Sequence, residues 1–141
     1  LKLMIRIRSI VEIAGFPKNH IEETMFKVIN NLKEDNEIKV IKTAISETTQ
    51  VKEIWSTFAE FELEFSDIKG LLNFAFDYTP SLIEIINPEK LDLESKEIED
   101  FLNDLLTKLH KYSMVVTSLN SENQILKSKL TENAENKRFK K

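Results

Sequence analysis

The feature that most constrains this chain is a regular apolar repeat between residues 98 and 130. Over five heptads, nine of the ten repeat positions are apolar or aromatic. These ten positions, called the seam below, are Ile98, Leu102, Leu105, Leu109, Tyr112, Val116, Leu119, Asn123, Leu126 and Leu130. Spacings of three and four residues place them on one side of a helix, as in the contact stripe of a coiled coil.

Two details of the repeat favour a homodimer. Asn123 occupies a position that, in a parallel two-stranded coiled coil, pairs with its own copy and fixes the register. Glu122 precedes Lys127 by five residues, the spacing of an attractive interchain pair. We therefore predict a long helix over residues 92–132 that dimerises as a coiled coil. Two alternatives stay open: a strand over residues 112–119, where helix propensity is low, or a helix packed on its own chain in a monomer.

The residues before the repeat predict a sheet with two helices. Residues 4–14 and 53–65 alternate apolar and polar side chains, which is typical of half-buried strands. Helical spacing follows each of them, over residues 18–34 and from 68 to about 78, with Asp67 as a candidate N-cap. Further strands are expected at residues 38–46, with a bulge near 39–42, and at 82–86.

This order of strand, helix, strand, strand, helix and strand predicts an α+β fold. It is the order of a ferredoxin-like βαββαβ two-layer sandwich, in which the first and third strands are central and both helices cover one face. We expect three parts: a head over residues 1–91, the coiled-coil helix over 92–132, and a flexible basic tail over 133–141.

Composition and charge exclude several classes of function. The chain has no cysteine, two histidines and two glycines, which leaves little material for a zinc site, a Ser-His-Asp triad or a glycine-rich phosphate loop. We therefore predict no enzymatic activity, no cofactor and no metal. The absence of a long apolar run predicts no membrane span, and the lack of cysteine favours a cytoplasmic protein.

The charge is unevenly distributed. The net charge is +2 over residues 1–52, −11 over 53–104 and +5 over 105–141. The acidic middle repels nucleic-acid phosphates, while the basic tail is a candidate polyanion contact. Its residues are Lys137, Arg138, Lys140 and Lys141. A nucleic-acid partner is possible on this basis but is not favoured, because a basic tail is more often only a solvated end.

Charged and aromatic residues of the head suggest further contacts. Arg6 and Arg8 share a face of the first strand that should meet Glu60, Glu62 and Glu64 of the third, so we predict cross-strand ion pairs rather than a catalytic or cation site. A candidate partner surface on the second helix is formed by Phe74, Phe76 and Tyr78. The alternative, which we prefer, is that Phe101 and Leu106 of the C-terminal helix cover these aromatic residues.

We predict from these features a non-enzymatic protein–protein interaction or assembly module, homodimeric through its C-terminal helix. The first alternative is a small-ligand-binding regulatory domain, with its site near the loop at residues 15–17. The second is a translation- or ribosome-associated factor that contacts RNA through the basic tail.

Overall fold

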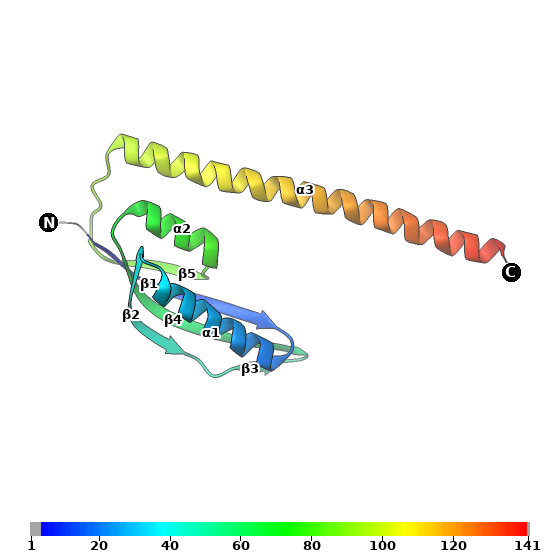
Figure 1. The fold of residues 1–141 in the computed structure, drawn as a ribbon, viewed down its shortest axis with the longest axis horizontal. Coiled ribbons are helices and arrows are strands. Elements are labelled where there is room, and N and C mark those ends of the chain that lie inside the picture. The colour runs from blue at the N-terminus through cyan, green and yellow to red at the C-terminus, as the bar shows by residue number, and fades with distance from the viewer. Residues whose placement is uncertain (1–3, 141) are drawn as a thin grey trace. The chain divides into compact units, whose positions relative to one another are not determined.

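The computed structural model describes residues 4–140 and has an α+β fold, which confirms the predicted class (Figure 1). The elements in chain order are β1 (Ile5–Gly15), α1 (Lys18–Glu34), β2 (Ile38–Ile45), β3 (Thr49–Val51), β4 (Ile54–Phe65), α2 (Ile68–Tyr78), β5 (Leu82–Asn87) and α3 (Ser95–Phe139). The chain divides into two compact units, Leu1–Phe101 and Leu102–Lys141. The boundary therefore falls within α3, about ten residues after the predicted end of the head.

The sheet of the first unit is antiparallel, with strand order β2-β4-β1-β5 and the short strand β3 also paired with β4. The two long strands β1 and β4 are central and pair along their whole length, from Ile5 opposite Phe65 to Gly15 opposite Trp55. Because side chains alternate between faces along a strand, this register places the apolar sets of both strands on the same side of the sheet.

The core lies on that side of the sheet, under both helices. From the sheet it contains Ile7, Phe61 and Phe65, all fully buried. Residues of α1 and α2 belong to the same cluster, with Met25 and Leu71 as examples. Both helices therefore cover one face, as predicted, and the opposite face of the sheet carries the charged residues.

Local signals in the sequence explain the boundaries of several elements. Helix α1 begins directly after Pro17, and the Asp67 carboxylate caps α2 by accepting a hydrogen bond of 2.8 Å from the Gly70 backbone N–H. The predicted bulge in β2 is present as a register shift between Val40 and Lys42. The short strand β3 was not predicted, because residues 47–52 are mostly polar and their number fits the loop of a hairpin.

Helix α3 is continuous over 45 residues. Residues 112–119 are helical, so the strand alternative for this stretch is wrong. The helix also continues beyond residue 132 to Phe139, through most of the segment predicted as a flexible tail. None of its residues is buried. No helix in residues 4–140 combines the length and apolarity needed to cross a membrane.

Candidate functional site

The seam on α3 is a long apolar stripe whose side chains are mostly exposed. Its eight most exposed apolar and aromatic side chains, from Ile98 to Leu130, retain 43–69% of their surface, while Leu105 is half-buried. These side chains form a continuous apolar stripe along one side of α3. The polar seam residue, Asn123, is also exposed.

The rest of the α3 surface differs from the seam in composition. Outside the seam, serine, threonine, lysine and glutamate dominate, although Leu106 and Val115 beside it are apolar and more than half exposed. Met114 and Ile125 are also apolar and more than half exposed. These two residues lie on the side of the helix away from the seam. They provide a comparison for any experiment that asks whether the seam itself, rather than apolar surface in general, makes contacts.

The charged face of the sheet carries the predicted Arg–Glu pairs. Arg6 donates to Glu64 Oε1 from Nε at 3.0 Å and from Nη2 at 2.6 Å, and the Glu64 side chain is only 13% exposed. Arg8 donates from Nη1 to Glu60 at 2.9 Å and from Nε to Glu84 of β5 at 3.0 Å. The two arginines thus connect three strands.

These pairs account for most of the acidic cluster on this face. Hydrogen bonds to Glu84 and then Glu60 raise the pKa of Arg8 above its ordinary value, which keeps the guanidinium charged. Glu62 faces Arg8 in the β1–β4 register but has no ion pair with any described residue, because the Arg8 guanidinium reaches Glu60 and Glu84 instead. Within residues 4–140, no group of three His, Asp or Glu side chains is arranged to hold a metal ion.

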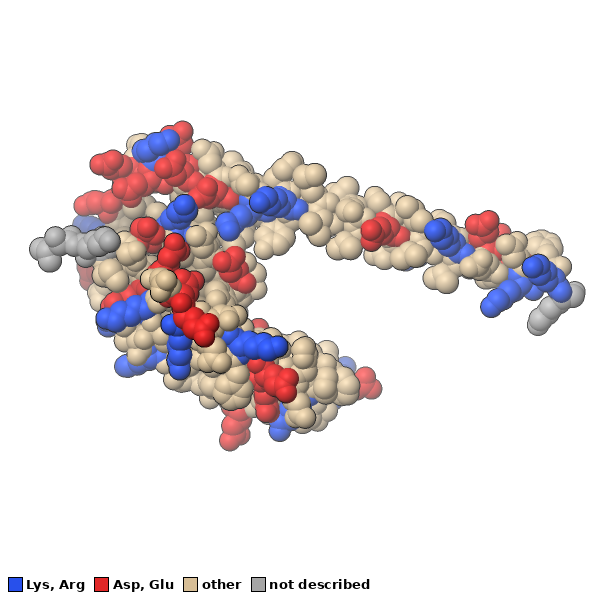
Figure 2. Space-filling view, viewed as in Figure 1, with Lys and Arg blue, Asp and Glu red and all other residues tan. Residues whose placement is uncertain are grey.

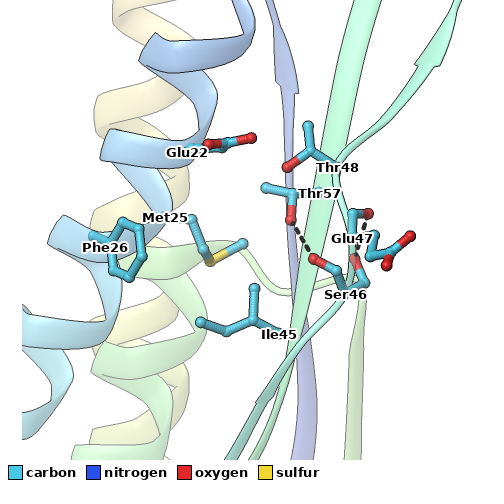
Figure 3. Close-up of a pocket in the computed structure, with 8 residues that line it drawn as sticks. All are labelled: Glu22, Met25, Phe26, Ile45, Ser46, Glu47, Thr48 and Thr57. Atoms are coloured by element: carbon cyan, nitrogen blue, oxygen red, sulfur yellow. Dashed lines mark hydrogen bonds between the residues drawn. The ribbon is translucent and has the colours of Figure 1, made fainter.

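A cavity of about 240 Å³ lies between the first half of α1 and the end of β2 (Figure 3). Its lining residues are Glu22, Met25, Phe26, Ile45, Ser46, Glu47, Thr48 and Thr57. The Thr57 hydroxyl donates to the Ser46 carbonyl at 3.3 Å, which joins β4 to the link after β2. The cavity is lined by apolar carbon, hydroxyl groups and two carboxylates. None of residues 15–17, where we expected a ligand site, lines it.

The aromatic residues of α2 do not form the predicted partner surface as a group. Phe74 is 1% exposed, because it packs between Phe65 of β4 and Tyr78, with ring centroids 5.6 and 5.4 Å away. Phe74 is therefore a core residue, while Phe76 and Tyr78 are half-buried. Burial raises the pKa of Tyr78, and the negative charges of Asp35 and Asp77 add to this shift.

The candidate polyanion contact is helical rather than flexible. Lys137 and Arg138 lie on the last turn of α3, Lys140 follows it, and all three are exposed. Lys141 lies outside the described residues. Positive side chains at the C-terminus of a helix also interact favourably with the helix dipole.

Two exposed apolar surfaces of the head were not predicted from the sequence. The edge strand β5 presents Leu82, Ile83, Ile85 and Ile86, each 36–44% exposed. The β3–β4 hairpin presents Val51 and Ile54. The available signal in β5 was that its apolar residues occupy both faces, without the alternation that marks the central strands.

Comparison with known proteins places the chain in a family. The model of the MJ0538 family matches residues 6–138, which is nearly the whole chain. The chain belongs to the MJ0538 family. This match includes the sheet and almost all of α3, so the long helix lies within the region that defines the family.

A relative in Methanocaldococcus jannaschii, the uncharacterized protein MJ0538, is 34% identical to the chain over 101 residues. The aligned part is 70% of this chain but 38% of that protein, so this MJ0538-family chain spans well under half the length of the relative. No solved structure matches the chain.

Proposed function

We propose that this chain is a non-enzymatic protein–protein interaction and assembly module, homodimeric through a coiled coil formed by α3. The observation that carries the proposal is the exposed seam on a helix with no buried residue. Helices in proteins gain most of their stability by packing an apolar face rather than from intrinsic helix propensity. A second copy of the same seam would provide that packing.

The sequence of α3 makes such packing necessary. Residues 113–123 contain serine, threonine, valine and asparagine, which are weaker helix formers than alanine or leucine. The seam runs along about 48 Å of helix at 1.5 Å per residue. When a second helix covers the seam, apolar surface is removed from water, which stabilises α3 in the stretch where its helix propensity is low.

We also propose that the head has the ferredoxin-like topology. The central position of β1 and β4, the antiparallel pairing and the two helices on one face support this assignment. The additional strand β3 is a departure from the simple four-stranded order. In this proposal the head presents its charged sheet face and the apolar β5 edge to another protein, and it carries no chemistry itself.

Molar mass in solution tests the dimer. The wild-type protein, at micromolar concentration, should have a molar mass of twice the 16.5 kDa of one chain when it is measured by light scattering during size-exclusion chromatography. A double variant, Leu109→Asp with Leu119→Asp, should give the monomer mass, because it places charges in the middle of the seam. A monomeric wild-type chain would disprove the proposal.

A matched control separates the seam from the rest of the helix. Met114→Asp introduces one such charge at an apolar residue that is as exposed as those of the seam but lies on the other side of α3. This variant should remain dimeric. Loss of the dimer in Met114→Asp would indicate that the substitutions act by weakening the helix and not by interrupting an interface.

A second candidate function is the binding of a small regulatory ligand, and the cavity beside α1 is the observation that favours it. Thermal shift measurements with amino acids and nucleotides test it, since a ligand that binds only the folded state raises its stability. A stabilisation that is lost in Ile45→Arg, at the rim of the cavity, but retained in Val51→Arg, on the exposed hairpin, would support this function.

A further inference from the structure

The two ends of α3 carry opposite charge. Residues 94–104 contain five carboxylates and one lysine, a net charge of −4, whereas residues 127–140 contain five basic and two acidic residues, a net charge of +3. Both segments belong to one uninterrupted helix, α3 (Figure 1). Only Glu94 and Lys140 lie just outside its ends. Figure 2 shows acidic side chains gathered at the start of α3 and basic side chains at its end.

We infer that two copies of α3 pair in antiparallel orientation. This inference rests on the homodimer proposed above and specifies how the second copy lies. Helix axes in a coiled coil are about 8–10 Å apart, which is close to the Debye length of about 8 Å at physiological ionic strength. A parallel pair would therefore hold the two acidic ends together and the two basic ends together, at a separation where salt screens their repulsion only in part. An antiparallel pair brings each acidic end against a basic one.

One antiparallel register uses the whole seam. It places Ile98 opposite Leu130 of the partner subunit and Leu109 opposite Leu119 of the partner subunit. All ten seam positions then face seam positions of the other copy. A shift by one heptad in one direction leaves Leu126 and Leu130 without seam residues opposite them. The shift in the other direction brings Lys108 opposite Lys129 of the partner subunit.

The same register also pairs charges beside the seam. Glu99 faces Lys127 of the partner subunit, and Lys108 faces Glu122 of the partner subunit. Each pair occurs twice because the dimer has twofold symmetry. Charged residues at the e and g positions beside the seam of a coiled coil determine the orientation of the partner helix more than the strength of binding.

Two features argue for the parallel orientation: Asn123 would pair there with its own copy, and Glu122 would pair with Lys127 of the partner subunit. In the antiparallel register Asn123 faces Leu105 of the partner subunit. A pair of asparagines contributes one or two neutral hydrogen bonds, whereas the parallel arrangement opposes like charges at both ends of the helix. The charge distribution therefore decides the orientation.

The orientation determines where the two heads attach. Each head is joined to the amino end of its α3, so in the antiparallel dimer the two Ser95 residues are about 57 Å apart along the helices, at 1.5 Å per residue. In the parallel dimer they would be about 10 Å apart. An antiparallel dimer thus presents two separated copies of the same head surface, which suits a module that bridges two partners.

Charge reversal at Lys127 tests the orientation, because Lys127 has a different partner in each arrangement. Its partner is Glu99 in the antiparallel dimer and Glu122 in the parallel one. Lys127→Glu should weaken dimerisation by on the order of tenfold, since two flanking pairs become repulsive. Adding Glu99→Lys to the same chain should restore the dissociation constant.

The control is the combination of Lys127→Glu with Glu122→Lys, measured by sedimentation at several concentrations. In the antiparallel dimer this variant stays weak, because the lysine introduced by Glu122→Lys would face Lys108 of the partner subunit. Rescue by Glu122→Lys instead of Glu99→Lys would overturn the antiparallel orientation while leaving the dimer intact. Rescue by neither would overturn the register, and a monomeric wild-type chain would overturn the dimer itself.

Distance measurement gives an independent test. The chain has no cysteine, so Asn103→Cys places a single spin label on an exposed position near the start of α3 and away from the seam. The two labels of an antiparallel dimer should be about 35 Å apart, from about 22 residues of helix rise and the separation of the axes. A main distance below about 20 Å would show parallel helices.

Discussion

The head and α3 contain similar apolar side chains but use them differently. Fifteen hydrophobic residues of the described chain are buried, and all lie between Ile5 and Phe74. Helix α3 has leucines at regular spacing and buries none. In the head, strands and helices that are distant in sequence cover each other, whereas a single helix cannot cover its own stripe. Apolar pattern alone therefore predicts burial only where the chain itself supplies a second surface.

The largest effect is expected in the head core. Phe61→Ala removes a fully buried ring from the centre of β4 and should lower the free energy of unfolding by about 3–5 kcal/mol. Phe58→Ala is the matched control, because Phe58 lies on the same strand but on the outer face and is 47% exposed. Urea unfolding should show less than about 1 kcal/mol for the control. Equal effects would contradict the placement of the core.

A smaller effect, confined to α3, is expected from helix propensity. Ser118, Ser121 and Ser128 are exposed and lie off the seam. Replacing all three with alanine should stabilise the helix by about 0.5 kcal/mol per site, and replacing them with glycine should destabilise it by a similar amount. Thermal melts followed by circular dichroism at about 222 nm would measure this helix signal. No difference between the two triple variants would mean that packing dominates α3 as it dominates the head.

The Arg6–Glu64 pair should contribute less than the core. Glu64→Gln removes the charge that accepts two hydrogen bonds from Arg6, and we expect a loss of about 0.5–1 kcal/mol because Arg6 is partly exposed. Glu62→Gln is the control, since Glu62 forms no ion pair within residues 4–140. Chemical unfolding at low and high salt should show the larger loss at low salt. A larger loss for Glu62→Gln would contradict the observed pairing.

The smallest effect concerns alkaline pH. Burial raises the pKa of Tyr78 in the folded state, so the fold favours the protonated phenol. Its contribution to stability is fully present below the unfolded pKa of about 10 and is lost as pH rises through the higher folded pKa. Tyr78→Phe cannot ionise, so its stability should decline less steeply above about pH 10. Parallel slopes for the two proteins would show that Tyr78 is as solvated when folded as when unfolded.

Much of the head could be predicted because local pattern fixes its elements. The alternation in residues 53–65 determines which side chains share a face of β4, since a strand has a period of two. Asp67 could be identified as a cap because its carboxylate can reach backbone N–H groups of the first turn. The ion pairs of Arg6 and Arg8 followed once β1 and β4 were predicted as neighbours.

Other features depended on which elements meet in space. Phe74 lies outside the predicted inner stripe of α2, and the sequence does not show what covers it; it is buried because Phe65 and Tyr78 pack around it. Strand β3 forms only because β4 extends far enough to pair with it. The cavity beside α1 likewise requires residues from three elements, and no local pattern shows that they come together.

The sequence by itself determined most of the helices and strands of the head, the faces of the central strands and the existence of a long apolar seam, because backbone geometry converts spacing directly into faces. Only the tertiary structure decided that the head completes its own core and that α3 continues onto a helical basic end. Burial is a property of two surfaces in contact, and the sequence specifies each surface without stating which pairs of them meet.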